Sequence, residues 1–210
     1  MSLSATARNL VAPAMRLGYR IHVHGGHRCP RRGPLLVVAP YRGFMDSTVI
    51  ATCLPRPVEV LVAPGGLAAL GGRLPGRIVV AEDEPGPGLR SARAVLGDSG
   101  AVGAWSDDGL ERAAGFLAAT SGAPVLPVVV LGGSGSHPGD PPAWRSRIDV
   151  VVGEPWLTES GPISRRHVVR VSEEIRQRVA DLAEHAVVRT GRAGGVALQP
   201  EGGAPDNGAL

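Results

Sequence analysis

Apolar residues in this 210-residue chain gather in short continuous runs that are separated by polar turns rich in glycine and proline. The run that organises the chain is Leu35–Ala39, which is wholly apolar and partly β-branched, a pattern typical of a strand buried on both faces. A polar turn follows, and then Asp46 and two hydroxyl residues precede Val49 and Ile50, which predicts the start of a helix. Because α/β proteins place their chemistry where a buried strand ends at a helix start, we expect the functional site here.

The rest of the chain repeats this alternation. Further strands are predicted at residues 21–24, 58–62, 78–81, 101–104, 125–131 and 148–152, helices at 4–20, 89–96 and 110–121, and a short helical or irregular piece at 67–74. Ser164 is predicted to cap a long helix in which Val171, Ile175 and Val179 recur at intervals of four. Strands alternating with helices predict an α/β domain at residues 21–190, with a mostly parallel sheet flanked by helices. Residues 1–20 are predicted to form an N-terminal helix, and residues 191–210 a disordered tail.

Charge is distributed unevenly along the chain. All 22 basic residues are arginine and the formal net charge is only +3, but no acidic residue precedes Asp46. Seven arginines fall in that acid-free region: Arg8, Arg16, Arg20, Arg28, Arg31, Arg32 and Arg42. The region favours contact with an anionic membrane or a phosphorylated ligand, although a solvated face balanced by acids elsewhere explains the pattern equally well. The N-terminal helix is likewise open to two interpretations, a membrane-touching interfacial helix or a cover for one edge of the core.

Composition argues against several classes of protein. The mild charge and the scarcity of aromatic residues disfavour binding of nucleic acid. No run approaches the roughly 18 apolar residues of a membrane span, and the start of the chain lacks the apolar core of a secretory signal. Cys29 and Cys53 have no metal-ligand spacing and fit a reducing compartment. We therefore expect a cytoplasmic protein, and any contact with membrane would be peripheral and on the inner face.

Several blocks of sequence resemble the glycerolipid acyltransferases, the 1-acylglycerol-3-phosphate acyltransferase family. Residues 122–128, Gly-Ala-Pro-Val-Leu-Pro-Val, match the family's last block almost letter for letter, and Gly-Glu-Pro at 153–155 matches the close of the following strand. The turn at 30–34 is similar to the family's lead-in to its first block, in which Phe44 and Asp46 also fit. The resemblance covers roughly residues 20–188 and implies a glycerol-3-phosphate acyltransferase-like fold.

The catalytic residues of the family are present only in part. In the family's first block a histidine acts as general base, and an aspartate five residues later orients it. Here Tyr41 stands at the histidine position and Asp46 at the aspartate position, so these two residues are the catalytic candidates. A tyrosine, with a reference pKa of about 10, is a donor at neutral pH, and loss of a general base typically lowers the rate about 10²- to 10⁴-fold.

The substrate-binding blocks have also changed. Glu82 stands where the family has an arginine for the substrate phosphate, and a carboxylate there would repel a phosphorylated acceptor. The family's Phe-Pro-Glu-Gly block becomes Trp-Ser-Asp-Asp at 105–108, which keeps an aromatic residue and a carboxylate. The substrate-binding candidates are therefore Arg42, Glu82, Trp105, Asp107 and Asp108. Structural roles are open as alternatives: Asp46 as a helix cap, Tyr41 as a partly buried aromatic residue, and Asp107 and Asp108 as turn and cap residues.

No metal and no bound cofactor are predicted. His22, His24 and His27 lie close together in sequence, but alternate strand positions with one loop residue are poor geometry for a metal site, and surface or packing roles are favoured. The resemblance implies acyl-coenzyme A or an acyl carrier protein as the donor of an acyl group.

Three functional hypotheses follow. The first, implied by the resemblance, is a divergent acyltransferase that moves an acyl chain from a thioester donor to a non-phosphorylated or unusual alcohol, amine or lipid acceptor. The second is a catalytically inactive relative that binds lipid, an acyl chain or a protein partner. The third is a different enzyme built from the carboxylates of Asp46, Glu82, Asp107 and Asp108, with or without a metal.

Overall fold

The computed structural model describes residues 13, 15–40, 45–62, 77–80, 85–105, 111–135, 137, 140–159 and 164–191. In chain order the strands are β1 (Arg20–His24), β2 (Leu35–Ala39), β3 (Glu59–Val62), β4 (Arg77–Val79), β5 (Ala101–Trp105), β6 (Val125–Leu131) and β7 (Arg147–Val152). The helices are the short 3₁₀ turn η1 (Gly26–Arg28), α2 (Asp46–Cys53), α4 (Gly86–Gly97), α5 (Glu111–Ser121) and α6 (Arg165–Thr190).

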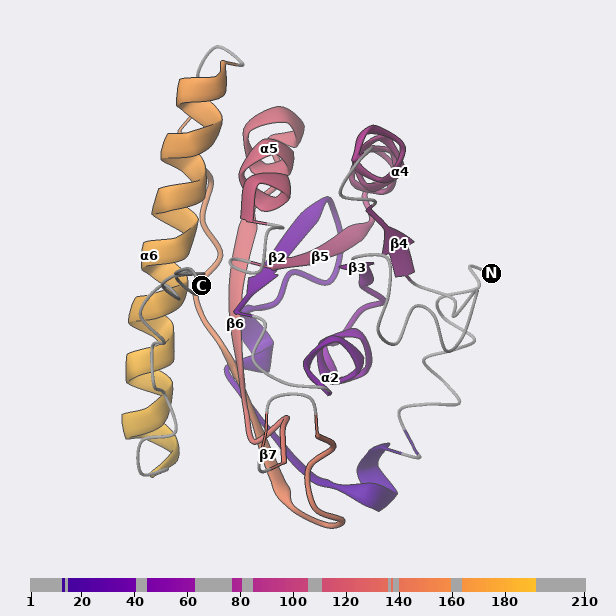
Figure 1. The fold of residues 1–210 in the computed structure, drawn as a ribbon, viewed down its shortest axis with the longest axis vertical. Helices are drawn as coiled ribbons and strands as arrows, with labels where there is room; N and C mark the ends of the chain where they lie inside the picture. The colour runs from indigo at the N-terminus through magenta and orange to yellow at the C-terminus, as the bar shows by residue number, and fades with distance from the viewer. Residues whose placement is uncertain are drawn as a thin grey trace, which may run out of the picture.

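The strands form one seven-stranded sheet in the order β1-β7-β6-β2-β5-β3-β4 (Figure 1). Every neighbouring pair is parallel except β6 and β7, which are antiparallel. Helices α4, α5 and α6 pack side by side along one face of the sheet, and α2 covers the other. The predicted α/β domain with a mostly parallel sheet flanked by helices is therefore confirmed.

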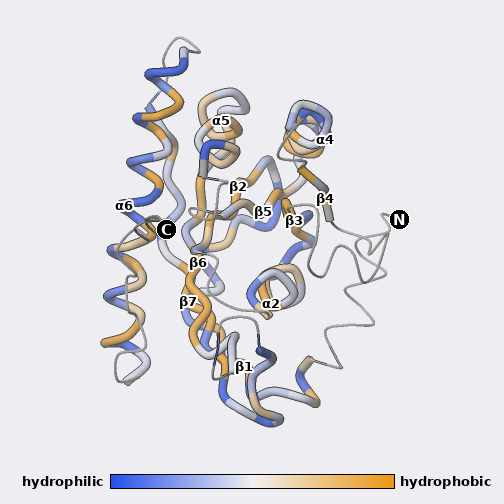
Figure 2. The backbone as a smooth tube through the Cα atoms, viewed as in Figure 1, coloured by the Kyte–Doolittle hydropathy of each residue, from blue (hydrophilic) through white to orange (hydrophobic). Residues whose placement is uncertain are grey.

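The centre of the sheet is built from the most continuous apolar runs of the sequence. Every residue of β2, β5 and β6 is buried. A central strand with helices on both faces needs apolar side chains on both, which is why these runs do not alternate with polar residues. Figure 2 shows the contrast with the outer layer: β6 and β7 are strongly hydrophobic, whereas α6 alternates between hydrophobic and hydrophilic positions.

Helix α6 follows its predicted pattern. The Ser164 side chain accepts a hydrogen bond of 3.2 Å from the backbone N–H of His167, which confirms the predicted N-cap. Buried positions recur along one side of the helix: His167, Val171, Ile175, Val179, Ala183, Ala186 and Thr190. The helix ends at Gly191, whose φ of 65° lies in the left-handed region that favours glycine.

Some local predictions need correction. In the predicted helix 4–20, residues 13 and 15–18 are helical, but Arg20 already belongs to β1. Met15 is buried, whereas Leu17 is 79 % exposed and does not join the core. Helix α4 begins at Gly86 rather than at residue 89, because a proline is tolerated in the first turn of a helix.

The predicted domain boundaries stay predictions. The irregular piece at 67–74, most of residues 1–20 and the tail beyond Gly191 lie outside the described residues. In the part of the chain that is described, no helix is both long enough and apolar enough to cross a membrane.

Candidate active site

Three neighbouring parallel strands end at one edge of the sheet. Strand β2 lies between β6 and β5, and the register pairs Ala39 at the end of β2 with Trp105 at the end of β5. Asp46 begins the helix that follows β2, and Gly133 follows β6, which ends at Leu131. In open α/β sheets ligands bind outside the carboxyl ends of the strands, so this edge is the candidate site.

Asp46 is held against the end of β6. Its side chain is 1 % exposed, and the backbone N–H of Met45 donates a hydrogen bond of 3.1 Å to the carbonyl of Gly133. A Cβ atom on Gly133 would collide with Oδ1 of Asp46, so the close approach of the two segments requires glycine. The sequence prediction missed Gly133; the signal that could have found it is the pair of glycines that directly follows a buried strand.

The alternative interpretation of Asp46 as the N-cap is wrong. Met45 occupies the N-cap position, and Asp46 is the first residue of the helix. A carboxylate in the first turn interacts favourably with the helix dipole, typically by about 0.3–1 kcal/mol at an exposed site. Burial of a charged carboxylate is far more unfavourable than this unless it is well partnered, so capping alone does not explain why an aspartate lies here.

Trp105, predicted to bind substrate, lies in the core. It is 4 % exposed, and its indole Nε1–H donates a hydrogen bond of 2.9 Å to the carbonyl of Leu61 in β3. Since an indole has a single N–H donor, contact with a substrate would use only the apolar surface of the ring. Substrate binding by Trp105 stays a prediction.

The other predicted site residues lie outside the described part of the chain. They are Tyr41 and Arg42 after β2, Glu82 after β4, and Asp107 and Asp108 after β5. The three strands that precede these residues, β2, β4 and β5, run in the same direction in the sheet. Their predicted roles therefore remain predictions.

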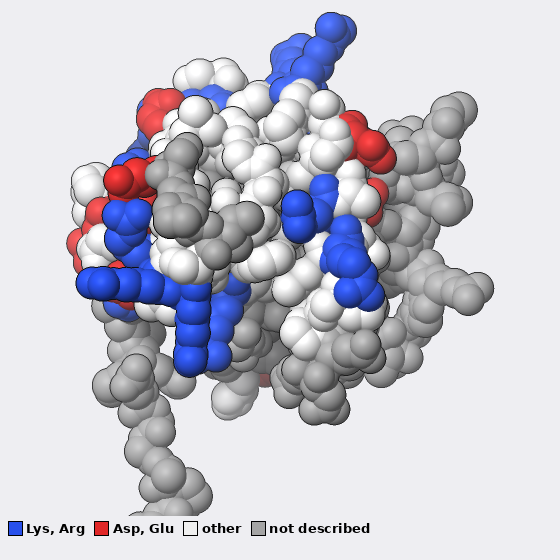
Figure 3. Space-filling view, turned by 90° about the horizontal axis from the view of Figure 1, so that it is seen from above, with Lys and Arg blue, Asp and Glu red and all other residues white. Residues whose placement is uncertain are grey.

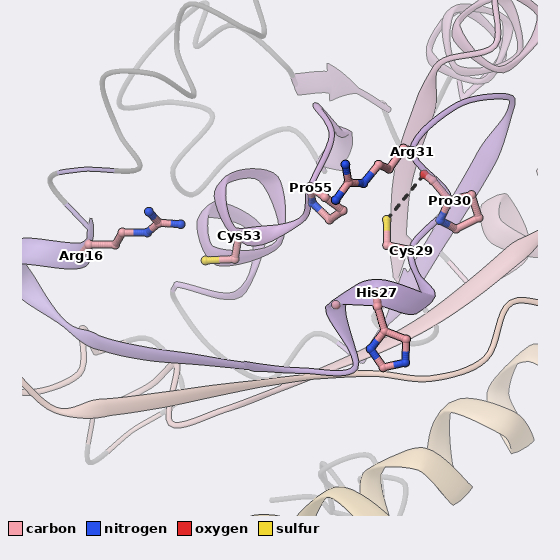
Figure 4. Close-up of a pocket in the computed structure, with 8 residues that line it drawn as sticks. Arg16, His27, Cys29, Pro30, Arg31, Cys53 and Pro55 are labelled. Atoms are coloured by element: carbon pink, nitrogen blue, oxygen red, sulfur yellow. Dashed lines mark hydrogen bonds between the residues drawn. The ribbon is translucent and has the colours of Figure 1, made fainter.

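An open cavity of about 650 Å³ lies at the other end of α2 from Asp46. It is lined by Arg16, Gly26, His27, Cys29, Pro30, Arg31, Cys53 and Pro55. Figure 4 shows the guanidinium groups of Arg16 and Arg31 on opposite sides of the α2 end that carries Cys53. Neither Asp46 nor Trp105, the two site candidates that the structure describes, is among these lining residues.

A buried arginine stabilises the loop that forms one wall of this cavity. Arg56 is 8 % exposed and donates hydrogen bonds to the carbonyls of Pro30, Gly33 and Ser99, at 3.4, 2.7 and 2.8 Å. Burial lowers the pKa of Arg56 from its ordinary value. Burial likewise raises the pKa of the Cys29 thiol, and the nearby Arg56 charge opposes that rise. Cys29 is therefore a neutral structural thiol at neutral pH rather than an activated nucleophile.

A histidine–aspartate pair is present, but on the other face of the sheet. Nε2 of His24 lies 2.9 Å from Oδ1 of the fully buried Asp149, and Nη2 of Arg147 donates to the same oxygen over 2.8 Å. Side chains alternate along β7, and the neighbours of Asp149 on its side, such as Val151, pack against α6. The pair therefore ties β1 to β7 away from Asp46. Among the residues that are described, no three His, Cys, Asp or Glu side chains group closely enough to hold a metal ion.

The sheet order and the placement of the helices define an α/β domain with a mostly parallel sheet. Among solved structures, the chain is similar to the 1-acyl-sn-glycerophosphate (LPA) acyltransferase PlsC from Thermotoga maritima, with a TM-score of 0.62 and 17 % sequence identity. The match covers 86 % of this chain and 79 % of that chain. It confirms at the level of the fold the resemblance predicted from sequence. No protein-family model matches the chain, and no curated protein matches it significantly.

Proposed function

We propose that this protein is a divergent acyltransferase. It takes an acyl chain from a thioester of coenzyme A or of an acyl carrier protein. In the reaction, an oxygen or nitrogen of the acceptor attacks the thioester carbonyl, the new ester or amide bond forms, and the carbon–sulfur bond breaks. The thiol leaves with the proton that the acceptor gives up. The observation that carries this proposal is Asp46, which is buried at the start of α2, the helix after β2, and stands in sequence at the position of the family's aspartate.

The acceptor in this proposal carries no phosphate. Glu82 stands at the position of the family's phosphate-binding arginine, and a carboxylate there repels a phosphorylated acceptor. A neutral alcohol, an amine or an uncharged lipid avoids this repulsion.

In this proposal Asp46 orients the acceptor, and Tyr41 does not act as its general base. A neutral phenol beside an ionised carboxylate donates a hydrogen bond to it, and such a pair holds a ligand oxygen but is poor at removing a proton. We therefore expect turnover below that of a relative with a histidine base, by about 10²- to 10⁴-fold.

The test is release of free thiol from acyl-coenzyme A and from acyl carrier protein by purified protein, with a panel of alcohols, amines and lipids. We expect release that depends on a non-phosphorylated acceptor, and turnover below about 1 s⁻¹ with 1-acylglycerol-3-phosphate. Asp46→Asn should lower the rate at least about 10²-fold, because the acceptor loses the group that orients it. Asp149→Asn is the matched control: it removes another buried carboxylate of the described residues, on the opposite face, and should lower stability without a specific loss of rate.

A second candidate function is that of a catalytically inactive relative that binds lipid, an acyl chain or a protein partner. The replacement of the family's base by Tyr41 is the observation that favours it. An acyl chain that stays bound, with no thiol released for any acceptor, would establish this function and end the first proposal. Activity that disappears on chelation of divalent metal would instead support a carboxylate-based enzyme.

A further inference from the structure

The cavity at the far end of α2 is formed where four separate segments of the chain meet. They are the stretch before β1, the turn η1, the loop between η1 and β2, and the end of α2. Asp46 lies at the start of α2 and Cys53 at its end, and eight residues of α-helix span about 12 Å. A recess of about 650 Å³ can hold a small organic molecule, because ligand pockets typically measure about 300–1,000 Å³.

Two arginines line this cavity without an acidic partner. Figure 4 shows the guanidinium groups of Arg16 and Arg31 extending from opposite sides toward the end of α2, with Cys53 between them. Neither arginine forms an ion pair with a described residue, and none of the described lining residues is acidic. Arg28 in η1 shows the contrast, because its Nε lies 2.7 Å from Oε1 of Glu154. The charges of Arg16 and Arg31 therefore remain for an anionic ligand.

Positive charge alone does not identify a site on this molecule. Figure 3 shows several groups of arginines on the upper face, with acidic side chains gathered mainly at the two sides of that view. Several arginines of α6 pair with glutamates, as in Arg176 with Glu173. What distinguishes Arg16 and Arg31 is that, within the part of the chain that is described, they have no acidic partner and line one recess.

A buried charge lies behind the wall of the cavity. Arg56 donates hydrogen bonds to two carbonyls of the loop before β2, at 3.4 Å to Pro30 and 2.7 Å to Gly33, and these acceptors are neutral. The same contacts fix the backbone next to Arg31, so the loop has its shape before a ligand binds. Arg56 has no acidic partner among the described residues either, so its charge adds to the attraction of an anion into the recess.

The rest of the lining fits an uncharged aliphatic group. Pro30, Pro55 and the two cysteines offer mainly apolar surface. No Phe, Tyr or Trp is among the described lining residues, so the cavity lacks the rings on which nucleobases usually stack. Two cationic groups on opposite sides, with apolar surface between them, favour a molecule that has a carbon chain in the middle and an anionic group at each end.

We propose that this cavity binds a soluble aliphatic bisphosphate, with one phosphate on Arg16, the other on Arg31, and the carbon chain against Pro30 and Pro55. Guanidinium groups bind phosphate oxygens through two parallel hydrogen bonds, which suits arginine to this role. Both arginines come from the acid-free N-terminal region, whose charge favours a phosphorylated ligand as one of its interpretations. The ligand is not the proposed acyl acceptor, which carries no phosphate, so the site goes beyond the proposed function.

The test is calorimetric titration of the full chain with fructose 1,6-bisphosphate and with fructose 6-phosphate, two sugars that differ by one phosphate. We expect saturable binding of the bisphosphate, about tenfold tighter than that of the monophosphate, because each phosphate engages one guanidinium. Binding should weaken as salt rises, since exposed charges are screened within about 10 Å at 0.1 M salt. Absence of saturable binding, or equal affinity for the two sugars, overturns the proposal.

Arg31→Gln and Arg32→Gln form a matched pair. The two neighbours are both exposed and lose the same charge, but of the two only Arg31 lines the cavity. We expect Arg31→Gln and Arg16→Gln to weaken bisphosphate binding about tenfold each, and Arg32→Gln to weaken it less than about twofold. Equal losses in Arg31→Gln and Arg32→Gln would reflect net charge rather than a site, and would overturn the proposal.

Cys53 gives a second measurement on the unaltered chain, because its partly exposed thiol lines the cavity between the two arginines. Iodoacetamide is uncharged, so its rate of reaction with Cys53 measures access to the cavity. Bisphosphate at about ten times its dissociation constant leaves about a tenth of the cavities free, and should slow alkylation of Cys53 about tenfold. An unchanged rate contradicts the proposal, as does binding seen only with phosphorylated lipid in vesicles. Both measurements need no acyl donor, so their failure leaves the proposed function intact.

Discussion

Asp46 is the residue on which the proposed acyl transfer depends most directly. Its carboxylate is buried and lies so close to Gly133 that no side chain fits between them. A strand end, a helix start and a second loop therefore define its position. This is the arrangement expected of a group whose orientation matters for chemistry, because side chains locked by packing hold a productive geometry.

A substitution of the single residue Tyr41 tests the proposed chemistry. Tyr41→His restores the family's base at its position in the sequence, so we expect a gain in thioester hydrolysis or acyl transfer of about 10²-fold or more. Tyr41→Phe should leave any native activity nearly intact, because the phenol is not the base in this proposal. Thiol release by both variants and the parent protein measures these effects. If Tyr41→Phe abolishes a native activity, the tyrosine is itself catalytic and the inactive-relative hypothesis fails.

The contact between α5 and α6 shows how one small residue sets the packing of two elements. A Cβ atom on Gly115 would lie 2.9 Å from the backbone carbonyl oxygen of Val168 and would collide with Oγ of Ser172. The helices can approach this closely only because α5 presents a glycine there. Gly115 thus has a packing role in α5 that no local sequence pattern indicated.

Replacing a helical glycine by alanine changes stability in two ways, through helix propensity and through packing, and two glycines of this chain distinguish the two effects. Gly115→Ala should destabilise the protein by about 1–3 kcal/mol, because the added methyl group forces the helices apart. This loss outweighs the gain of about 1 kcal/mol that alanine offers over glycine in a helix. Gly97→Ala in α4 is the control, since nothing lies within 4 Å of its Cβ position. It should be neutral or stabilising in denaturant unfolding, and an equal loss in both variants would contradict the packing argument.

Arg56 connects parts of the molecule that are far apart in sequence. Its guanidinium donates hydrogen bonds to the carbonyls of Pro30 and Gly33, before β2, and of Ser99, before β5. Strands β2 and β5 are neighbours in the sheet, so one side chain organises the entry into two central strands. The partners of the Arg56 guanidinium are carbonyl oxygens rather than a carboxylate. They accept hydrogen bonds from its N–H groups, but as neutral groups they do not balance its positive charge.

We expect Arg56→Met to lower the free energy of unfolding by about 2–4 kcal/mol. Buried carbonyls that lose their donor each cost about 1–3 kcal/mol, and relief of the buried charge offsets part of the loss. Arg176→Met is the control, because its pair with Glu173 is exposed and worth less than about 1 kcal/mol. Urea unfolding of both variants is the measurement. Similar stabilities for the two would show that Arg56 does not hold the strand entries together.

The described core, the strands and the fold class could be predicted from the sequence, because the spacing of apolar residues within a segment indicates its secondary structure and its burial. Strand β2 is apolar at every position, and Val171, Ile175 and Val179 recur at helical spacing behind the cap at Ser164. Each of these signals acts over a few neighbouring residues. The antiparallel turn from β6 into β7 and the exposure of Leu17 had no comparable local signal, since both depend on where distant segments pack.

By itself, then, the sequence determined which segments are buried and in what order they alternate, because burial follows the periodicity of apolar side chains. It also determined that Tyr41 stands where the resemblance expects a base. Only the tertiary structure decided which residues from different segments meet: Asp46 with Gly133, His24 with Asp149, and Trp144 with Gly18. Such contacts join residues tens to more than a hundred positions apart, and the packing of the whole chain, not local preference, brings them together.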